Sequence, residues 1–305
     1  MRQARMRMPK EIETYLDERR ALVEKALEKL MPQPSGLAGE VITSMNYSLF
    51  AGGKRLRPIL CIAGAEAVGG SADAVLSIAC ALELIHTYSL IHDDLPAMDN
   101  DDFRRGKPTN HKVFGEAVAL LAGDGLLTLA FNLMARHGFE SGIEKGLLVR
   151  AIDLISNAAG YKGMVGGQTV DIAYEGKEPD PAVVEYIHRH KTGSLIAAAV
   201  TSGAILAGGN EEQERSINRY GQQVGLAFQI ADDVLNVEGD MDIMGKGIGS
   251  DKARGKMTYP SVFGITESKR TQEELVESAI DSLKGFDEKA DPLRNIARYI
   301  IKRKA

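Results

Sequence analysis

Acidic and basic side chains follow one another closely in a stretch whose residue types suit one particular chemistry. Residues 92–107 hold five aspartates and then three basic residues: Asp93, Asp94, Asp99, Asp101, Asp102, Arg104, Arg105 and Lys107. A carboxylate next to a phosphate costs about 4 kcal/mol at an effective dielectric constant of about 20. A bridging Mg²⁺ turns this repulsion into a net attraction, and arginine adds bidentate contacts to phosphate oxygens. The stretch therefore predicts a binding site for a metal-bound diphosphate. The plainer interpretation is a solvated acidic turn.

The spacing within this stretch sharpens the prediction. Asp93 and Asp94 are neighbours at the end of an apolar helical pattern, whereas Asp99 would lie about 120° away if the helix continued. Pro96 ends the helix, so a loop can return Asp99 to the side of Asp93. An oxygen-only cluster suits Mg²⁺, and the chain has no Cys/His set for zinc. An EF-hand loop is excluded because its sixth position, counted from Asp99, is Arg104 rather than glycine.

A second acidic and basic stretch lies near the C-terminal third of the chain. Asp232, Asp233 and Asn236 stand at helical positions i, i+1 and i+4, so all three can face one cavity. More charged residues follow: Glu238, Asp240, Asp242, Lys246, Lys252, Arg254 and Lys256. The alternative is an acidic helix end followed by a solvated, glycine-rich loop.

Residues 52–58, Gly-Gly-Lys-Arg-Leu-Arg-Pro, form a different motif, a basic loop that begins with two glycines. The two glycines let the backbone approach a ligand, and Pro58 suits the first turn of a helix whose N-terminus attracts anions. Beside two acidic stretches this loop predicts a site for a second diphosphate without metal. His86 lies seven residues before Asp93, on nearly the same helix face and about 10 Å away. From its spacing alone, His86 is more typical of a core histidine than of a ligand.

The elements that must position these residues are helices. Apolar residues recur at three- and four-residue steps, whereas the period-2 alternation of strands is nearly absent. We expect helices over 10–30, 38–50, 58–68, 71–92, about 115–136, 141–160, 164–174, 181–207, 211–237, 260–267, 271–284 and 292–302. No linker or composition break divides them, so the sequence predicts a single all-α domain over 1–305.

Composition excludes several classes of protein. The 305 residues are 44% apolar, which is too many for a disordered chain. A net charge of −5, no tryptophan and 6% aromatic residues argue against nucleic-acid binding. The uninterrupted apolar runs are too short to span a membrane, and no secretory leader is visible. Cys61 and Cys80 belong to no CxxC motif, so we expect buried thiols and a cytoplasmic protein.

Taken together, the motifs resemble those of the short-chain trans-polyprenyl diphosphate synthases. The first acidic stretch, with Pro96-Ala97 inserted between its aspartates, resembles that of bacterial farnesyl and plant or cyanobacterial geranylgeranyl diphosphate synthases. The remaining family segments occur in the family's order: 52–58, His190-Lys191-Thr192-Gly193, Phe228-Gln229-x-x-Asp232-Asp233, Gly245-Lys246 and Lys256-x-Thr258-Tyr259-Pro260. The likeness covers about residues 40–265.

This resemblance implies a helical bundle of the isoprenoid synthase type around a central cavity, and a homodimer. It also implies an Mg²⁺-dependent prenyltransferase, in which an allylic diphosphate ionises and its cation is attacked by isopentenyl diphosphate. Metal ions stabilise the charge that develops on the leaving diphosphate, and apolar helices keep water from the cation.

The resemblance also assigns roles to individual residues. About three Mg²⁺ ions per site would be held by Asp93, Asp94, Asp99 and Asp232. The allylic diphosphate would be gripped by Arg104, Lys246 and Lys256, and isopentenyl diphosphate by Gly53, Lys54, Arg57, His86 and Arg105. Lys191, Thr192 and Gln229 would line the cation. Gln168 and Asp171 share a helix face and either border the cavity or stabilise a helix contact.

Two positions bear on how this chain differs within the family. Asn236 replaces the usual third aspartate of the second motif, which predicts a modestly weaker Mg²⁺ demand and no loss of activity. Tyr88 lies five residues before Asp93, where a bulky residue forms a floor for the growing chain in this family. An aromatic floor favours a fifteen-carbon farnesyl product over a twenty-carbon geranylgeranyl product; alternatively Tyr88 only packs in the core.

Two other classes of protein share part of the pattern. A class I terpene cyclase uses an aspartate-rich Mg²⁺ motif but does not need the second diphosphate site at 52–58. A non-catalytic subunit of a heteromeric synthase is expected to have lost the first aspartate motif, which is whole here. Residues 1–9 and 266–305 carry no recognisable chemistry and predict packing helices only.

Overall fold

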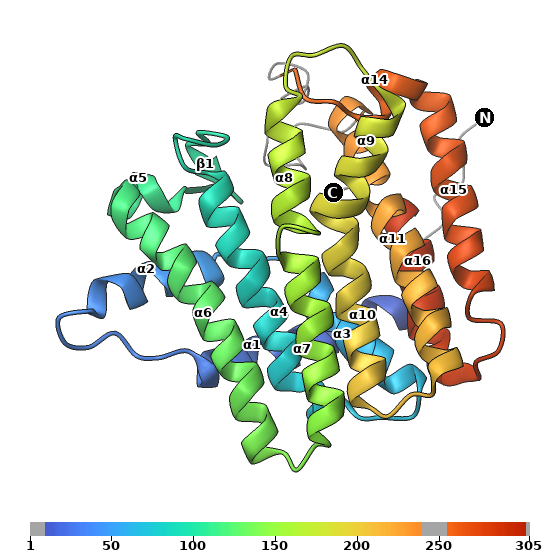
Figure 1. Ribbon diagram of the computed structural model, residues 1–305, viewed down its shortest axis with the longest axis horizontal. Coiled ribbons are helices and arrows are strands. Elements are labelled where there is room, and N and C mark those ends of the chain that lie inside the picture. Colours follow the sequence, from blue (N-terminus) through green and yellow to red (C-terminus); the bar gives the residue numbers. More distant parts are fainter. Residues whose placement is uncertain (1–9, 239–254, 303–305) are drawn as a thin grey trace.

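Helix α4 (Ala72–Asp93) runs through the middle of the protein because apolar residues cover its whole circumference. It packs against α3 (Leu56–Ala67) on one side and α6 (Glu116–Glu140) on the other (Figure 1). Ser71 caps it by accepting a hydrogen bond from the Ala74 backbone N–H at 3.4 Å. The computed structural model describes residues 10–238 and 255–302.

The other helices complete the bundle. They are α1 (Lys10–Leu30), α2 (Gly39–Leu49), α5 (Asn110–Phe114), α7 (Lys145–Ala159), α8 (Met164–Ala173), α9 (Pro181–Ile187), η1 (His188–Gly193), α10 (Ser194–Leu206), α11 (Glu211–Glu238), α14 (Tyr259–Phe263), α15 (Ile265–Asp281), η2 (Glu288–Ala290) and α16 (Asp291–Lys302). The prediction of a single all-α domain is confirmed, and most predicted helix ends fall within a few residues of the observed ones.

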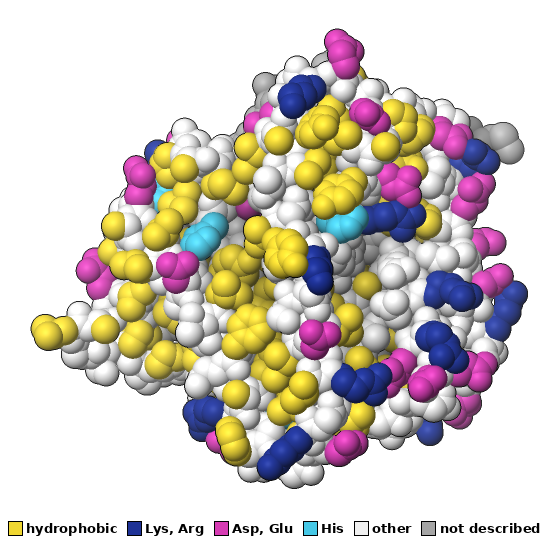
Figure 2. All heavy atoms as spheres, in the orientation of Figure 1, with side chains coloured by type: hydrophobic (Ala, Val, Ile, Leu, Met, Phe, Trp, Pro, Cys, Tyr) yellow, Lys and Arg dark blue, Asp and Glu magenta, His cyan; other side chains and the backbone are white. Residues whose placement is uncertain are grey.

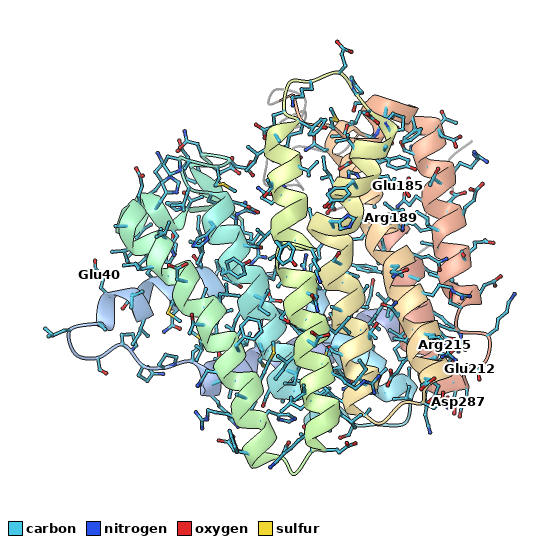
Figure 3. All side chains as sticks on the ribbon, viewed as in Figure 1. Glu40, Glu185, Arg189, Glu212, Arg215 and Asp287 are labelled. Atoms are coloured by element: carbon cyan, nitrogen blue, oxygen red, sulfur yellow. The ribbon has the colours of Figure 1, made fainter. Side chains whose placement is uncertain are left out.

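The predicted helix over 181–207 is interrupted at its centre. Residues 188–193 form η1, a π-helical turn, between α9 and α10. An ion pair one turn apart, Arg189 to Glu185 at 2.7 Å, lies on the outer side of this segment (Figure 3). Apolar periodicity does not reveal a π-turn, because it changes the hydrogen bonding of the backbone more than the residue types.

A small hairpin is the one departure from an all-helical pattern in the described residues. Strands β1 (Phe103–Arg104) and β2 (Lys107–Pro108) pair antiparallel, with Arg104 opposite Lys107. The turn residues Arg105 and Gly106 both have positive φ, 53° and 74°, as a type I′ turn requires. Two-residue strands are too short to show alternation, so the sequence did not predict them.

Helices α3 and α10 approach unusually closely in the core. A Cβ at Gly64 would lie 2.0 Å from the Val200 carbonyl oxygen, and one at Gly203 would lie 1.9 Å from that of Cys61. Glycine is thus required at both positions. Cys61 and Cys80 are buried as expected, and burial raises the pKa of each thiol to about 12.

The C-terminal helices pack on the bundle, as the sequence predicts, whereas residues 1–9 lie outside the described residues. Helix α15 lies along α11, and α16 contacts α11, α3 and α1. The buried Tyr220 hydroxyl of α11 donates to the Leu293 carbonyl oxygen of α16 at 2.6 Å. This contact joins the C-terminal helix to the core.

Two helices of the described chain are long and apolar enough to cross a membrane by length and composition alone. They are α4, whose apolar window is 67% buried within the protein, and α6, whose window is 39% buried. Neither helix is one uninterrupted apolar run, so the length of such runs in the sequence does not identify them as candidates. The core helix of a folded bundle passes the same test, so this is weak evidence for a membrane span.

Candidate active site

The first acidic motif forms a loop that turns back on the end of α4. Helix α4 ends at Asp93, and the Asp99 backbone N–H donates to the Asp93 carbonyl oxygen at 2.8 Å. The prediction that a loop after Pro96 returns Asp99 to Asp93 is therefore confirmed. Asp94 points differently, since both its carboxylate oxygens accept hydrogen bonds from Arg104, at 2.6 to 2.9 Å.

Asp93 and Asp99 lie in an electrostatically balanced cluster. Burial raises the pKa of Asp93, and the charge of Asp99 raises it further, while Lys191, Arg104 and Lys256 oppose both effects. Asp99 accepts a hydrogen bond from Lys256 Nζ at 2.9 Å. Two carboxylates whose charges repel favour a bound cation, and here the protein's own lysines and arginine supply part of that charge.

The basic loop before α3 is held by a buried ion pair. Arg55, at φ 52°, has only 3% of its surface exposed, and its Nη1 donates to Glu83 Oε1 at 2.8 Å. Its Nη2 donates to the Leu49 carbonyl oxygen at 2.7 Å. Neither Arg55 nor Glu83 was singled out from the sequence, although one acidic residue within an apolar helix is a signal that could have found the pair.

Three basic groups of this region border the central cavity: Arg57, His86 and Arg105. Burial lowers the pKa of His86 well below its usual value, and Arg57 and Arg105 lower it further. His86 is therefore neutral at neutral pH before any anion arrives. Its position in the cavity favours a ligand role over a core role.

Gly53 makes room for one of these groups. Arg105 Nη1 donates to the Gly52 carbonyl oxygen, and a Cβ on Gly53 would lie 2.9 Å from the Arg105 guanidinium. Gly53 also has a φ of 138°, which side chains rarely adopt. The glycine thus lets the guanidinium lie flat on the loop.

We expect Gly53→Ala to weaken the binding of inorganic diphosphate about tenfold, because it displaces the Arg105 guanidinium. Isothermal titration calorimetry measures the effect. Gly36→Ala is the matched control, since Gly36 also has positive φ, 66°, but no heavy atom lies within 4 Å of its Cβ position. Equal affinities in the two variants would show that the contact with Arg105 does not matter.

Lys54 lies apart from this group. It is exposed and borders a neighbouring cavity of about 240 Å³ together with Arg20, Phe228 and Tyr299. Phe228 lines both cavities and separates them. Lys54 is therefore not brought to the same wall as Arg57 in this arrangement.

The second wall of the site comes from η1 and α11. The Thr192 hydroxyl donates to Gln229 Oε1 at 2.7 Å, and Lys191 Nζ lies 2.6 Å from Asp171 Oδ2. Asp171 also lies 3.9 Å from Lys256 Nζ, so one buried carboxylate orients two lysines. Of the predicted pair, Gln168 lines the central cavity, whereas Asp171 lies outside that lining and joins α8 to η1 through Lys191.

Both walls face one cavity of about 540 Å³. It is lined by acidic, basic and polar residues that the sequence singled out: Arg57, His86, Tyr88, Asp93, Arg104, Arg105, Gln168, Lys191, Thr192, Gln229 and Asp232. Apolar side chains complete the lining, among them Met98, Met164, Val165, Ile172 and Phe228. Gln168 turns a buried amide to this lining, and neither its nitrogen nor its oxygen has a hydrogen-bond partner within the described ranges.

Oxygen donors suited to a hard cation are present, but not as a preformed cluster. Within residues 10–238 and 255–302, no three His, Cys, Asp or Glu side chains gather as a metal site. Asp93 ends α4, Asp99 lies on the loop that returns to it, and Asp232 shares the cavity with Asp93. Carboxylates of this kind fit Mg²⁺. Asp94 is engaged by Arg104 in this arrangement.

Part of the second motif cannot be placed. Lys246, expected to grip a diphosphate, lies outside the described residues, as do Asp240, Asp242, Lys252 and Arg254. Asn236 lies on α11 one turn after Asp232 and is partly exposed.

Comparison with known proteins shows which family the chain belongs to. The polyprenyl synthetase family profile matches residues 39–298. Geranylgeranyl diphosphate synthase of Cyanophora paradoxa is 48% identical over 291 residues, covering 95% of this chain and 96% of the relative. Farnesyl diphosphate synthase of Geobacillus stearothermophilus is 44% identical over 292 residues, covering 96% and 98%.

Solved structures give the same answer for the fold. The crystal structure of an FPP/GFPP synthase from Zymomonas mobilis has a TM-score of 0.85 at 35% identity, covering 95% of this chain and 99% of that one. Geranylgeranyl pyrophosphate synthetase of Pyrococcus horikoshii has a TM-score of 0.86 at 30% identity, covering 96% and 98%. By sequence and by fold, this chain belongs to the polyprenyl synthetase family.

Proposed function

We propose that this protein is a short-chain trans-prenyltransferase that joins an allylic diphosphate to isopentenyl diphosphate and releases diphosphate. One observation carries the proposal. Carboxylates of both acidic motifs, Asp93 and Asp232, line the same cavity as the basic groups Arg57, His86 and Arg105. An enzyme that holds two diphosphates, one through metal and one through protein cations, needs both kinds of wall around one space.

The two walls would divide the binding of the substrates. Arg57, His86 and Arg105 would hold isopentenyl diphosphate by charge and hydrogen bonds, and the neutral His86 can accept a proton as the anion binds. Asp93, Asp99 and Asp232 would hold Mg²⁺. Mg²⁺ bound there would stabilise the negative charge that develops on the departing allylic diphosphate.

The rest of the lining would protect and orient the reacting carbons. Thr192 and Gln229, hydrogen-bonded to each other at 2.7 Å, present oxygens to the cavity, and Lys191 is held beside them by Asp171. Met164 and Phe228 add apolar surface that excludes water from the carbocation.

We propose a fifteen-carbon farnesyl product, with the twenty-carbon geranylgeranyl product as the alternative. The reason is Tyr88, a nearly buried aromatic side chain that borders the cavity on α4, five residues before Asp93. The relatives include both farnesyl and geranylgeranyl diphosphate synthases, so the comparison does not choose between the two products.

The test is to incubate the protein with dimethylallyl and isopentenyl diphosphates and Mg²⁺, and to size the products by chromatography after dephosphorylation. A fifteen-carbon alcohol supports the proposal in full, and a twenty-carbon alcohol supports the reaction with the other product. A parallel reaction with geranyl or farnesyl diphosphate and Mg²⁺ but no isopentenyl diphosphate tests the other enzyme class, since release of a cyclic hydrocarbon there would identify a terpene cyclase. No consumption of either substrate would identify a non-catalytic subunit.

We also propose a homodimer. Hydrophobic side chains gather on the surface over α6 and α7 (Figure 2). Several of them are well exposed, including Leu121, Phe139 and Val149 at 55%, 84% and 64%. An exposed apolar face on two long helices is typical of a contact with a second copy. Sedimentation velocity tests this, and a monomer at micromolar concentration would contradict it.

A further inference from the structure

Asp233 differs sharply from Asp232, its neighbour in the second acidic motif. Asp232 lines the central cavity, whereas Asp233 is buried beside it with 4% of its surface exposed. Asp233 Oδ2 accepts hydrogen bonds from His188 Nε2 at 2.7 Å and from the Tyr259 backbone N–H at 2.8 Å. Asp233 Oδ1 accepts one from Gln229 Nε2 at 3.1 Å. Because a carboxylate only accepts, His188 carries its proton on Nε2.

The contact with His188 supports the π-helical turn. His188 is 2% exposed and begins η1, which carries Lys191 and Thr192 into the cavity. The far end of η1 also lies against α11, since a Cβ at Gly225 would be 2.7 Å from the Gly193 Cα. The turn is therefore attached to α11 at its first residue by Asp233 and at its last by a glycine contact.

The other two contacts of Asp233 reach two further groups of the site. Gln229, which donates to Asp233, accepts the Thr192 hydroxyl through its own oxygen at 2.7 Å. Tyr259 begins α14 and follows by three residues Lys256, whose Nζ lies 2.9 Å from Asp99 Oδ1. One buried carboxylate thus connects η1, Gln229 and the segment that carries Lys256.

We infer that Asp233 is a positioning residue that holds these three parts of the site in place, and that it is not a ligand of the metal. The inference rests on the proposed function. If Asp233 turned to the central cavity, the buried His188 donor would be left unpaired, and the Tyr259 backbone N–H and the Gln229 amide would lose their acceptor, which opposes that movement. Asp232 is then the member of the pair that meets the metal-bound diphosphate.

The first experiment compares Asp233→Asn with Asp232→Asn in titrations of activity against Mg²⁺. We expect Asp233→Asn to lower kcat about tenfold or more, because Lys191, Thr192 and Gln229 lose their fixed positions. The Mg²⁺ concentration for half-maximal activity should stay within about twofold of the parent. Asp232→Asn should raise that concentration about tenfold. A rise of the same size in Asp233→Asn would overturn the inference.

The second experiment does not depend on activity. Amide hydrogen exchange, measured without metal or substrate, should be faster in Asp233→Asn than in the parent at residues 188–193 and 259–263. Asp232→Asn should leave exchange in both segments unchanged. Unchanged exchange in Asp233→Asn would overturn the inference even if its kcat fell.

A third variant separates loss of the contact between His188 and Asp233 from general misfolding. His188→Phe keeps a buried ring but removes the donor, so it should reproduce the faster exchange at 188–193 and the lowered kcat. The double variant with Asp233→Asn should be little worse than either single variant, because both changes break one contact. Additive losses would overturn the inference. If the parent makes no prenyl product, the proposed function fails, while hydrogen exchange still decides the role of Asp233.

Discussion

Asp93→Asn is expected to lower kcat with dimethylallyl and isopentenyl diphosphates by about 10²- to 10³-fold. Asp93 ends α4 at the cavity, in a position where burial and the charge of Asp99 already raise its pKa. The asparagine keeps the shape but removes the negative charge that would hold a cation against the leaving diphosphate. Steady-state kinetics at saturating Mg²⁺ measure the loss.

Asp102→Asn is the matched control for this change. Asp102 lies on the same loop, but its side chain is 62% exposed and pairs with Lys112 at 2.7 Å, outside the cavity lining. We expect its kcat to stay within about twofold of the parent, as surface ion pairs contribute little. Similar losses in the two variants would mean that the loop as a whole, and not the Asp93 charge, matters.

Tyr88→Ala is expected to change the main product from fifteen carbons to twenty or more. Tyr88 is 7% exposed and borders the cavity, and its ring packs edge-on against His92 with ring centroids 5.6 Å apart. It lies about 7.5 Å before Asp93 along the helix axis, which suits a floor beneath a growing chain. Removing the ring opens space for another isoprene unit. Product sizing by chromatography, at equal conversion of isopentenyl diphosphate, measures the shift.

Tyr88→Phe provides the control, because it keeps the ring and removes only the hydroxyl. Its main product should match that of the parent. Thermal denaturation of both variants separates a change in the floor from a general loss of packing. An unchanged product from Tyr88→Ala would show that the chain does not reach this residue.

Much of the helical fold could be predicted because its causes are local. The apolar spacing of 10–30 and 71–92, the cap at Ser71 and the break before Pro96 each depend on residues within a few positions, and α1 and α4 confirm them. The return of Asp99 to Asp93 followed from the same local geometry. The π-turn η1 was missed because it leaves the periodicity of 181–207 almost unchanged.

The candidate site likewise has residues that could be predicted from the sequence and residues whose positions depend on the tertiary structure. Residue types and spacing sufficed to single out Asp93 and the loop of Arg57, and the family resemblance added Gln229; all three residues line the cavity. The sequence did not predict that Lys54 would border a different cavity, since the direction of a long side chain depends on its neighbours in space.

By itself, then, the sequence determined the helices, the single domain and the two kinds of charged wall, because these follow from residue types at short spacing. The tertiary structure alone decided which partner each charge takes. Lys256 reaches Asp99 across 157 residues, and His188 reaches Asp233 across 45. Such pairs form only after the helices pack, because each buried charge must then find its counterpart among the groups brought near it.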